Sequence, residues 1–86
     1  MEILVPTPLR SYTGGRAAVE AVGATLADVL ADLDRRYPGI RFRMIDEQDR
    51  VRQHIRLFVD GSLARELTAP VQAGQTVQIV CALSGG

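Results

Sequence analysis

The stretch TLADVLADLDRRYPG, Thr25–Gly39, predicts the one long helix around which the rest of the chain is arranged. Thr25 is a favourable N-cap residue, and Asp28 places a negative charge near the positive end of the helix dipole. Pro38 and Gly39 end the helix. The charged residues fall mostly on the polar side: Asp28, Asp32, Arg35 and Arg36. The apolar residues at helical spacing form the face that we expect to be buried: Leu26, Val29, Leu30, Leu33 and Tyr37.

Two short strands are predicted before this helix. The apolar run Ile3–Val5 is the first, and Pro6 ends it. The pair Gly14-Gly15 predicts residues of positive φ in a hairpin turn. Ala17–Val22 then returns as the second strand, which Gly23 closes.

Three further strands are predicted after the helix. The segment Ile40–Gln53 has little periodicity and is interpreted as a long loop with an irregular strand or turn. Ile55–Val59 is a strand, and Asp60-Gly61 is a strong hairpin signal. Ser62–Leu67 is predicted to return briefly as an edge strand, and Thr76–Ala82 is predicted to be the last strand.

Element order suggests the fold class. Two hairpins separated by one helix give an α+β layer of sheet and helix. If the first and last strands pair in the centre, the helix crosses one face of a mixed sheet of four to five strands. That arrangement is the β-grasp, the fold of ubiquitin. We expect a domain over residues 1–82 and a flexible tail over 83–86.

Composition narrows the classes of function. Eighty-six residues form a single domain with ten basic and ten acidic side chains, and this balance argues against nucleic-acid or membrane partners. All ten basic residues are arginine. A lone cysteine, Cys81, excludes a disulfide framework, and with one histidine besides it makes a structural metal site unexpected. With neither a signal-peptide pattern nor a membrane-spanning run, we expect a cytoplasmic protein.

The last residues, Gly85 and Gly86, point to chemistry at a C-terminal carboxyl. Neither residue has a Cβ, so this end is thin enough to enter a narrow channel of a partner enzyme. A free carboxylate is a poor electrophile and needs activation, most simply by ATP as an acyl-adenylate. A frayed chain end without function is the alternative interpretation.

Two segments carry a resemblance to a known family. The stretch Pro6–Gly15, PTPLRSYTGG, and the tail Ile79–Gly86, IVCALSGG, resemble those of the ubiquitin-like sulfur carriers of the MoaD/ThiS type, above all the CysO-like carriers of cysteine biosynthesis. The likeness covers essentially the whole chain. Several members have proline where this chain has Cys81. This difference affects the expected stiffness of the tail and not the expected activity.

The resemblance implies a carrier without an active site or bound cofactor of its own. An E1-like enzyme, using its own ATP and magnesium, would adenylate Gly86, and a sulfur donor would convert it to a thiocarboxylate. A sulfur-accepting biosynthetic enzyme, either cysteine synthase-like or a synthase large subunit, would then use that sulfur. Cysteine biosynthesis is the preferred pathway, while molybdopterin or a secondary metabolite remains open.

Candidate contact residues lie in the tail and on the sheet. Gly85 permits passage through a channel, and Ser84 belongs to the same tail. Leu83 and Ala82 are expected to anchor the tail in partner grooves. A partner-facing apolar patch would include Phe58 and Leu63, and docking on an acidic surface would use Arg10, Arg56 and Arg65.

Cys81 and His54 have ordinary structural interpretations. Cys81 is expected to be a small buried hydrophobe, the alternative being an intramolecular thioester with the terminus. His54 is expected to lie partly exposed at a strand end, with a general base or ligand as the alternative.

Two other functions stay open. The same tail would serve a protein modifier that is conjugated to lysines of other proteins. A β-grasp interaction or RNA-binding module with an incidental tail is the second alternative, and neutral charge with few aromatic residues counts against RNA binding.

Overall fold

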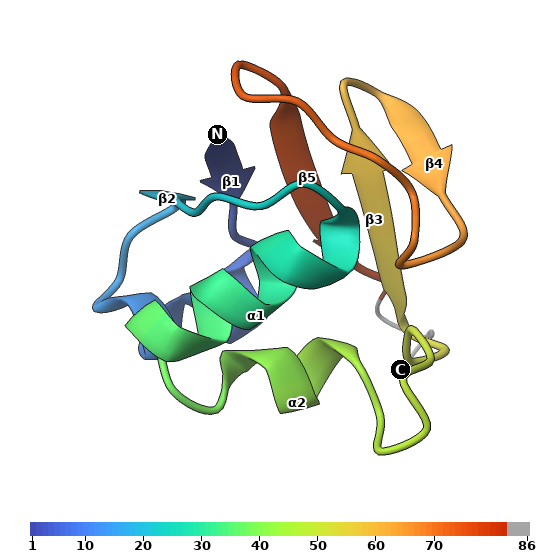
Figure 1. The fold of residues 1–86 in the computed structure, drawn as a ribbon. Helices are drawn as coiled ribbons and strands as arrows, with labels where there is room; N and C mark the ends of the chain where they lie inside the picture. The colour runs from blue at the N-terminus through green and yellow to red at the C-terminus, as the bar shows by residue number, and fades with distance from the viewer. Residues whose placement is uncertain (83–86) are drawn as a thin grey trace.

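The computed structural model describes residues 1–82, which form a five-stranded sheet with helices packed on one face (Figure 1). In chain order the elements are β1 (Glu2–Leu4), the 3-10 helix η1 (Thr7–Thr13), β2 (Ala18–Glu20), α1 (Leu26–Arg36), α2 (Ile40–Met44), β3 (Ile55–Val59), β4 (Ser62–Ala64) and β5 (Thr76–Cys81).

The strand order of the sheet is β2-β1-β5-β3-β4. The first and last strands, β1 and β5, pair in parallel at the centre, and every other pairing is antiparallel. This central pairing confirms the expected β-grasp arrangement. It also places β5 between two strands, of which β1 pairs with residues 76–78 and β3 with residues 77–81. The last residues of β5 are therefore held by β3 alone.

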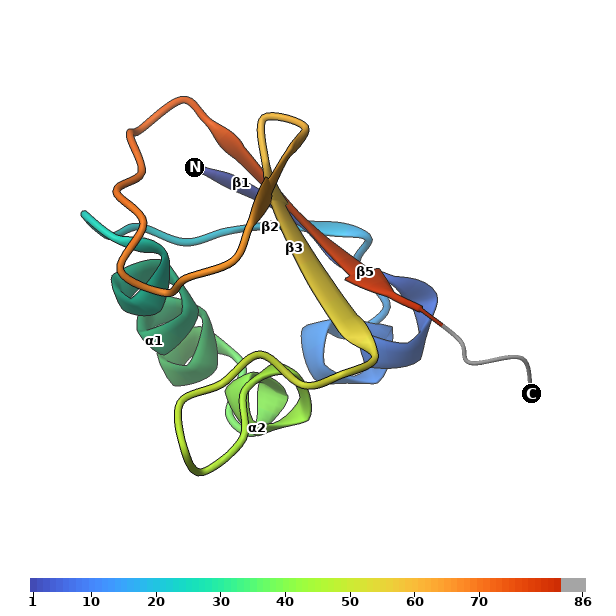
Figure 2. The same ribbon diagram turned by 90° about the vertical axis from the view of Figure 1, so that its right-hand side faces the viewer.

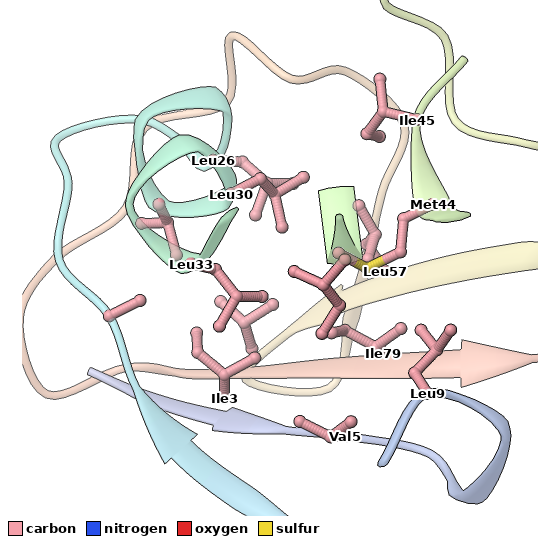
Figure 3. Close-up of a cluster of buried hydrophobic side chains, with 14 of the residues drawn as sticks. Ile3, Val5, Leu9, Leu26, Leu30, Leu33, Met44, Ile45, Leu57 and Ile79 are labelled. Carbon is pink, nitrogen blue, oxygen red and sulfur yellow. The ribbon is translucent and has the colours of Figure 1, made fainter. Parts of the chain in front are cut away.

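Helix α1 begins and packs as its sequence predicts. The Thr25 side-chain oxygen accepts a hydrogen bond from the Asp28 N–H at 3.2 Å. On the inner face, Leu26 and Leu30 are fully buried against sheet residues such as Ile3 and Leu57 (Figure 3). The apolar stripe of α1 and the alternate residues of the strands therefore form one core, as the helical spacing predicts.

The expectation that Asp32 lies on the polar side of the helix is wrong. Its side chain is only 7% exposed, because the carboxylate turns to the linker that follows β2. Asp32 accepts the Val22 N–H at 3.0 Å and pairs with the guanidinium groups of Arg35 and Arg36. Gly23 makes this approach possible, since a Cβ there would lie 2.5 Å from the Val29 nitrogen. The carboxylate thus fastens the linker to the helix.

Replacing Asp32 with alanine should lower the free energy of unfolding by about 1–3 kcal/mol, because the Val22 N–H and two guanidinium groups lose their acceptor. Urea unfolding followed by circular dichroism measures the change. The exposed Glu47, which accepts none of the hydrogen bonds that the structure gives within residues 1–82, is the control as Glu47→Ala. A loss for Asp32→Ala no larger than that of the control would contradict the fastening role.

The connection between β1 and β2 is longer than the predicted tight turn. It contains η1, which ends at Gly14, where φ is 65°, followed by Gly15 at 86°. The positive φ expected of this pair is therefore confirmed. The 3-10 helix is new, and it brings Leu9 into the core beside the end of β5.

The interpretation of Ile40–Gln53 as a loop is wrong for its first part, which forms α2. Asp34 caps this short helix by accepting the N–H groups of Gly39 and Arg41, both at 3.1 Å. The two ends of α2, Ile40 and Met44, are fully buried.

The second part of that segment is a turn built on Asp46, whose carboxylate accepts the Arg50 N–H at 3.0 Å and the Gln48 N–H at 2.8 Å. The hydrogen bond from Arg50 is the main cause that holds the pKa of Asp46 below its ordinary value.

Strands β3, β4 and β5 lie where the sequence predicts them, but β4 and β5 are shorter than predicted. The turn between β3 and β4 has positive φ at Asp60 (48°) and Gly61 (85°), as the hairpin signal predicts. Strand β4 stops at Ala64, so the predicted edge strand Ser62–Leu67 is shortened.

Candidate functional site

The candidate site is the place where the chain leaves the sheet. Strand β5 pairs with β3 up to Cys81, which lies opposite Ile55. One step further, the Ala82 N–H donates to the His54 carbonyl at 2.7 Å. Ala82 is exposed and is the last described residue. The other predicted tail residues lie outside the described part of the chain: Leu83, Ser84, Gly85 and Gly86.

Two hollows flank the end of β5, one on each side of Cys81. A hollow of about 560 Å³ lies between the β1–η1 segment and β5, with Val80 and Arg10 in its lining. A second, of about 310 Å³, lies between η1, α2 and the segment before β3, and includes Phe42. Figure 2 shows β5 running past η1 at this end of the sheet. The strand end is therefore accessible from both faces.

Basic side chains surround this exit, and we call them the tail-exit collar: Arg10, Arg43, Arg52, His54 and Arg56. Each lines a hollow that also contains Cys81 or Ala82. The third of these hollows lies beside Ala82 and is lined by Gln53, His54 and Arg56. Among the described residues, no carboxylate lines any of the three. A chain with no net charge thus has a positive pole where its tail begins.

Backbone carbonyls position three of the collar guanidinium groups. Arg10 Nε donates to the Val5 carbonyl at 2.9 Å, and Arg52 Nε donates to the Phe42 carbonyl at 2.7 Å. Arg56 Nη1 donates to the carbonyls of Gln53 (2.7 Å) and Ile55 (3.0 Å). The planar guanidinium with several donors can make such contacts and still present a charged edge to a partner.

Arg52 also stacks on an exposed aromatic ring. Its guanidinium carbon lies 4.5 Å from the centroid of Phe42, a side chain that is 56% exposed. The sequence gives little warning of Phe42 or Arg43 as site residues, because α2 is too short to show a helical period. Arg52 lies in the irregular segment before β3, which has no period either.

An apolar patch lies on the sheet face opposite the helices. Phe58 and Leu63 are directly opposite each other on β3 and β4, and both point away from the core side, where Leu57 is buried. Phe58 is half-buried and Leu63 is 40% exposed. Leu4 and Val80 lie on the same face and are half-buried. We call these four residues the open-face patch.

The predicted docking arginines are only partly brought together. Arg10 and Arg56 belong to the collar, on different sides of β5. Arg65 is exposed beyond β4 and lines a further hollow together with Arg56 of the collar and Leu63 of the open-face patch.

Cys81 and His54 are both more exposed than expected: Cys81 is partly buried where a buried residue was expected, and His54 is exposed where a partly exposed one was expected. Cys81 is partly buried against the core, and this burial raises the pKa of its thiol. Such a thiol is a weak nucleophile near neutral pH. His54 is exposed at the start of β3, where its backbone carbonyl holds Ala82.

Two features are absent from residues 1–82, the part of the chain that the structure describes. This part of the chain has no group of three or more His, Cys, Asp or Glu residues that could hold a metal ion. In the same residues, no helix has the length and apolar character that crossing a membrane requires.

Comparisons with known proteins agree with this geometry. The ThiS family profile matches residues 3–86. The sulfur carrier protein CysO of Mycobacterium tuberculosis (strain ATCC 25618 / H37Rv) is 34% identical, with 98% of this chain and 96% of that protein covered. CysO of Mycobacterium bovis shows the same identity and coverage.

Solved structures extend the likeness. A chain of the Amycolatopsis orientalis BexX/CysO complex is similar with a TM-score of 0.93 and 35% identity, covering 99% of this chain and 98% of that chain. Mycobacterium tuberculosis CysO gives 0.91 and 31%, with 95% and 98% covered. SAMP1 from Haloferax volcanii gives 0.79 and 26%, with 99% and 97% covered.

Proposed function

The chain belongs to the ThiS family, and on this premise we propose that it is a sulfur carrier whose working group is the carboxyl of Gly86. One observation carries the proposal above all: a likeness to sulfur carrier proteins that spans nearly the whole chain. The site geometry supports it, since the sheet holds the chain up to Ala82 and only four residues follow.

The proposed reaction has two covalent steps. The Gly86 carboxylate attacks the α-phosphate of ATP in an E1-like enzyme, and pyrophosphate leaves, so that an acyl-adenylate forms. Hydrosulfide, as the sulfur donor, then attacks the acyl carbon, AMP leaves as the carbon–sulfur bond forms, and loss of a proton gives the thiocarboxylate. ATP and magnesium belong to the activating enzyme, and this chain acts as its co-substrate.

A second enzyme then takes sulfur from the thiocarboxylate. The likeness to CysO proteins favours cysteine biosynthesis as the destination, and with it a cytoplasmic location. The complex of CysO with BexX in Amycolatopsis orientalis supports a partner enzyme for this chain as well. Holding sulfur on a protein raises its local concentration at the acceptor.

The described residues would serve as docking surface. The open-face patch offers apolar area along the sheet, with Val80 nearest to the exit and Phe58 and Leu63 further back, level with Gln78. The collar offers positive charge around the exit. Partners are therefore expected to have an apolar surface beside an acidic channel mouth.

Replacing Phe58 with aspartate should raise the KM of the activating enzyme for this chain by about 10- to 30-fold, because a buried aromatic anchor at an interface contributes about 2 kcal/mol. Steady-state AMP release measures it. Ala18→Asp is the matched control, since Ala18 is exposed on the same face at the edge strand β2. Equal KM values for the two variants would show that the open-face patch does not contact the activating enzyme.

AMP release also tests the function itself. The activating enzyme encoded by the same organism should form AMP from ATP only when this chain and a sulfur donor are both present. No AMP release above the chain-free background, with an enzyme that activates its known carrier, would argue against the proposal.

Conjugation to other proteins is a second candidate, favoured by the likeness to the Haloferax volcanii small archaeal modifier protein SAMP1. A modifier would appear in cells as a ladder of isopeptide-linked products that disappears when Gly86 is deleted. A carrier alone would give no such ladder.

A further inference from the structure

Apart from His54, every basic residue of the tail-exit collar is an arginine. The whole chain contains no lysine. Both side chains supply a positive charge, but only the lysine amine is also a nucleophile at accessible pH. At pH 8.5 about one lysine in a hundred is a free amine, whereas fewer than about one arginine in a thousand is deprotonated.

The collar lies within reach of the terminal carboxyl. Four residues follow Ala82, and an extended segment of that length spans at most about 14 Å. Arg56 lines a hollow together with Ala82, and Arg43 lines one together with Cys81. An amine at either position would meet an activated Gly86 at an effective concentration of about 1 mM.

Reaction of such an amine with the activated Gly86 would inactivate the carrier. An amine that attacks the acyl-adenylate forms an amide and releases AMP and a proton. The amide closes the tail into a ring on its own domain, and the terminal carboxyl is then lost to sulfur transfer.

We propose that the tail-exit collar supplies docking charge while withholding any amine that could capture the activated Gly86, so that the carrier does not acylate itself. This inference rests on the proposed function, since it concerns the activated form of the same carboxyl.

The other nucleophilic atoms among the described residues of the three hollows are poorly suited to capture: the Thr7 hydroxyl, the Cys81 thiol and the His54 imidazole. Burial raises the pKa of Cys81, and its backbone is paired with Ile55 in the sheet. An acyl group on His54 would be hydrolysed back to the carboxylate, so it leaves no lasting product.

The amino group of Met1 lies at the other end of the sheet. It donates to the Ala21 carbonyl at 2.9 Å. Glu2 is opposite Thr76 at the start of β5, six residues before Ala82.

The test uses a full-length chain whose Gly86 carboxyl is a thioester, made by thiol cleavage of an intein fused after Gly86. This activation needs no partner enzyme. Arg56→Lys and Arg43→Lys keep the charge and add an amine. Ala73→Lys is the matched control, because Ala73 is exposed in the turn before β5, about 20 Å of strand away from the exit.

Intact mass at pH 8.5 separates the products, because the ring is lighter than the hydrolysed chain by one water. With protein at about 10 µM, the collar variants should form the ring about a hundredfold faster than Ala73→Lys forms any amide. The chain without substitution should give only the hydrolysed product.

Equal ring formation in the collar variants and in Ala73→Lys would overturn the inference, and so would a ring in the unsubstituted chain. Failure of the proposed function would appear elsewhere, as absent AMP release with the activating enzyme. The two ideas therefore fail in different experiments.

Discussion

Deletion of Gly86 is expected to lower the rate of thiocarboxylate formation at least about a hundredfold. The shortened chain still ends in a glycine carboxylate, but that group is drawn back by about 3.5 Å from where the activating enzyme would hold it. A misplacement of about 1 Å can already cost a hundredfold in rate. The effect should therefore appear in the rate of AMP release at saturating ATP.

Ser84→Ala is the control for this deletion, because it changes a tail residue and keeps the chain length. It should stay within a few fold of the unsubstituted chain. If the deleted chain kept full activity, the position of the terminal carboxyl would not be what the enzyme recognises.

Leu57→Ala is expected to have the largest effect on stability, a loss of about 2–5 kcal/mol. Leu57 is fully buried on β3, between Ala64 of β4 and Ile79 of β5, and it packs in the core below α1. A domain of this size has about 5–15 kcal/mol of stability in all, so the melting temperature should fall by more than about 10 °C.

Urea unfolding followed by far-UV circular dichroism suits the measurement, since the chain has no tryptophan. Leu63→Ala removes the same atoms from the open face, where the side chain is 40% exposed, and should cost less than about 1 kcal/mol. Similar losses for the two leucines would mean that the helix-covered face is not the main core.

The order and type of the main elements could be predicted because strong local sequence signals specify each of them. The Thr25 cap, the stripe from Leu26 to Leu33 and the Asp60-Gly61 turn each specify their element through short-range chemistry. Strand order then followed from the sequence of elements, and the parallel pairing of β1 with β5 confirms it.

What could not be predicted depends on contacts between distant segments. Helix α2 has five residues, and its stability comes from the burial of Ile40 and Met44 and from the Asp34 carboxylate. The burial of Asp32 likewise requires the linker at Val22 to pass over the helix. Neither contact produces a periodic sequence pattern from which it could be predicted.

The tail-exit collar also depends on contacts between segments that are distant in the sequence. Arg10 comes from η1, Arg43 from α2, and Arg56 from β3, and only the folded structure brings them around the end of β5. The sequence predicts Arg10, Arg56 and Arg65 as docking residues, and the structure places Arg56 and Arg65 in one hollow while Arg10 lines another. Their docking role stays a prediction. The tail predictions for residues 83–86 lie beyond the described part of the chain and stay predictions.

Intact-mass analysis after incubation with the activating enzyme, ATP, magnesium and sulfide tests the central claim most directly. The account predicts a product in which one terminal oxygen is replaced by sulfur, with fragment masses that place the change on Gly86. An unchanged mass, under conditions in which the enzyme converts a known carrier, would contradict it.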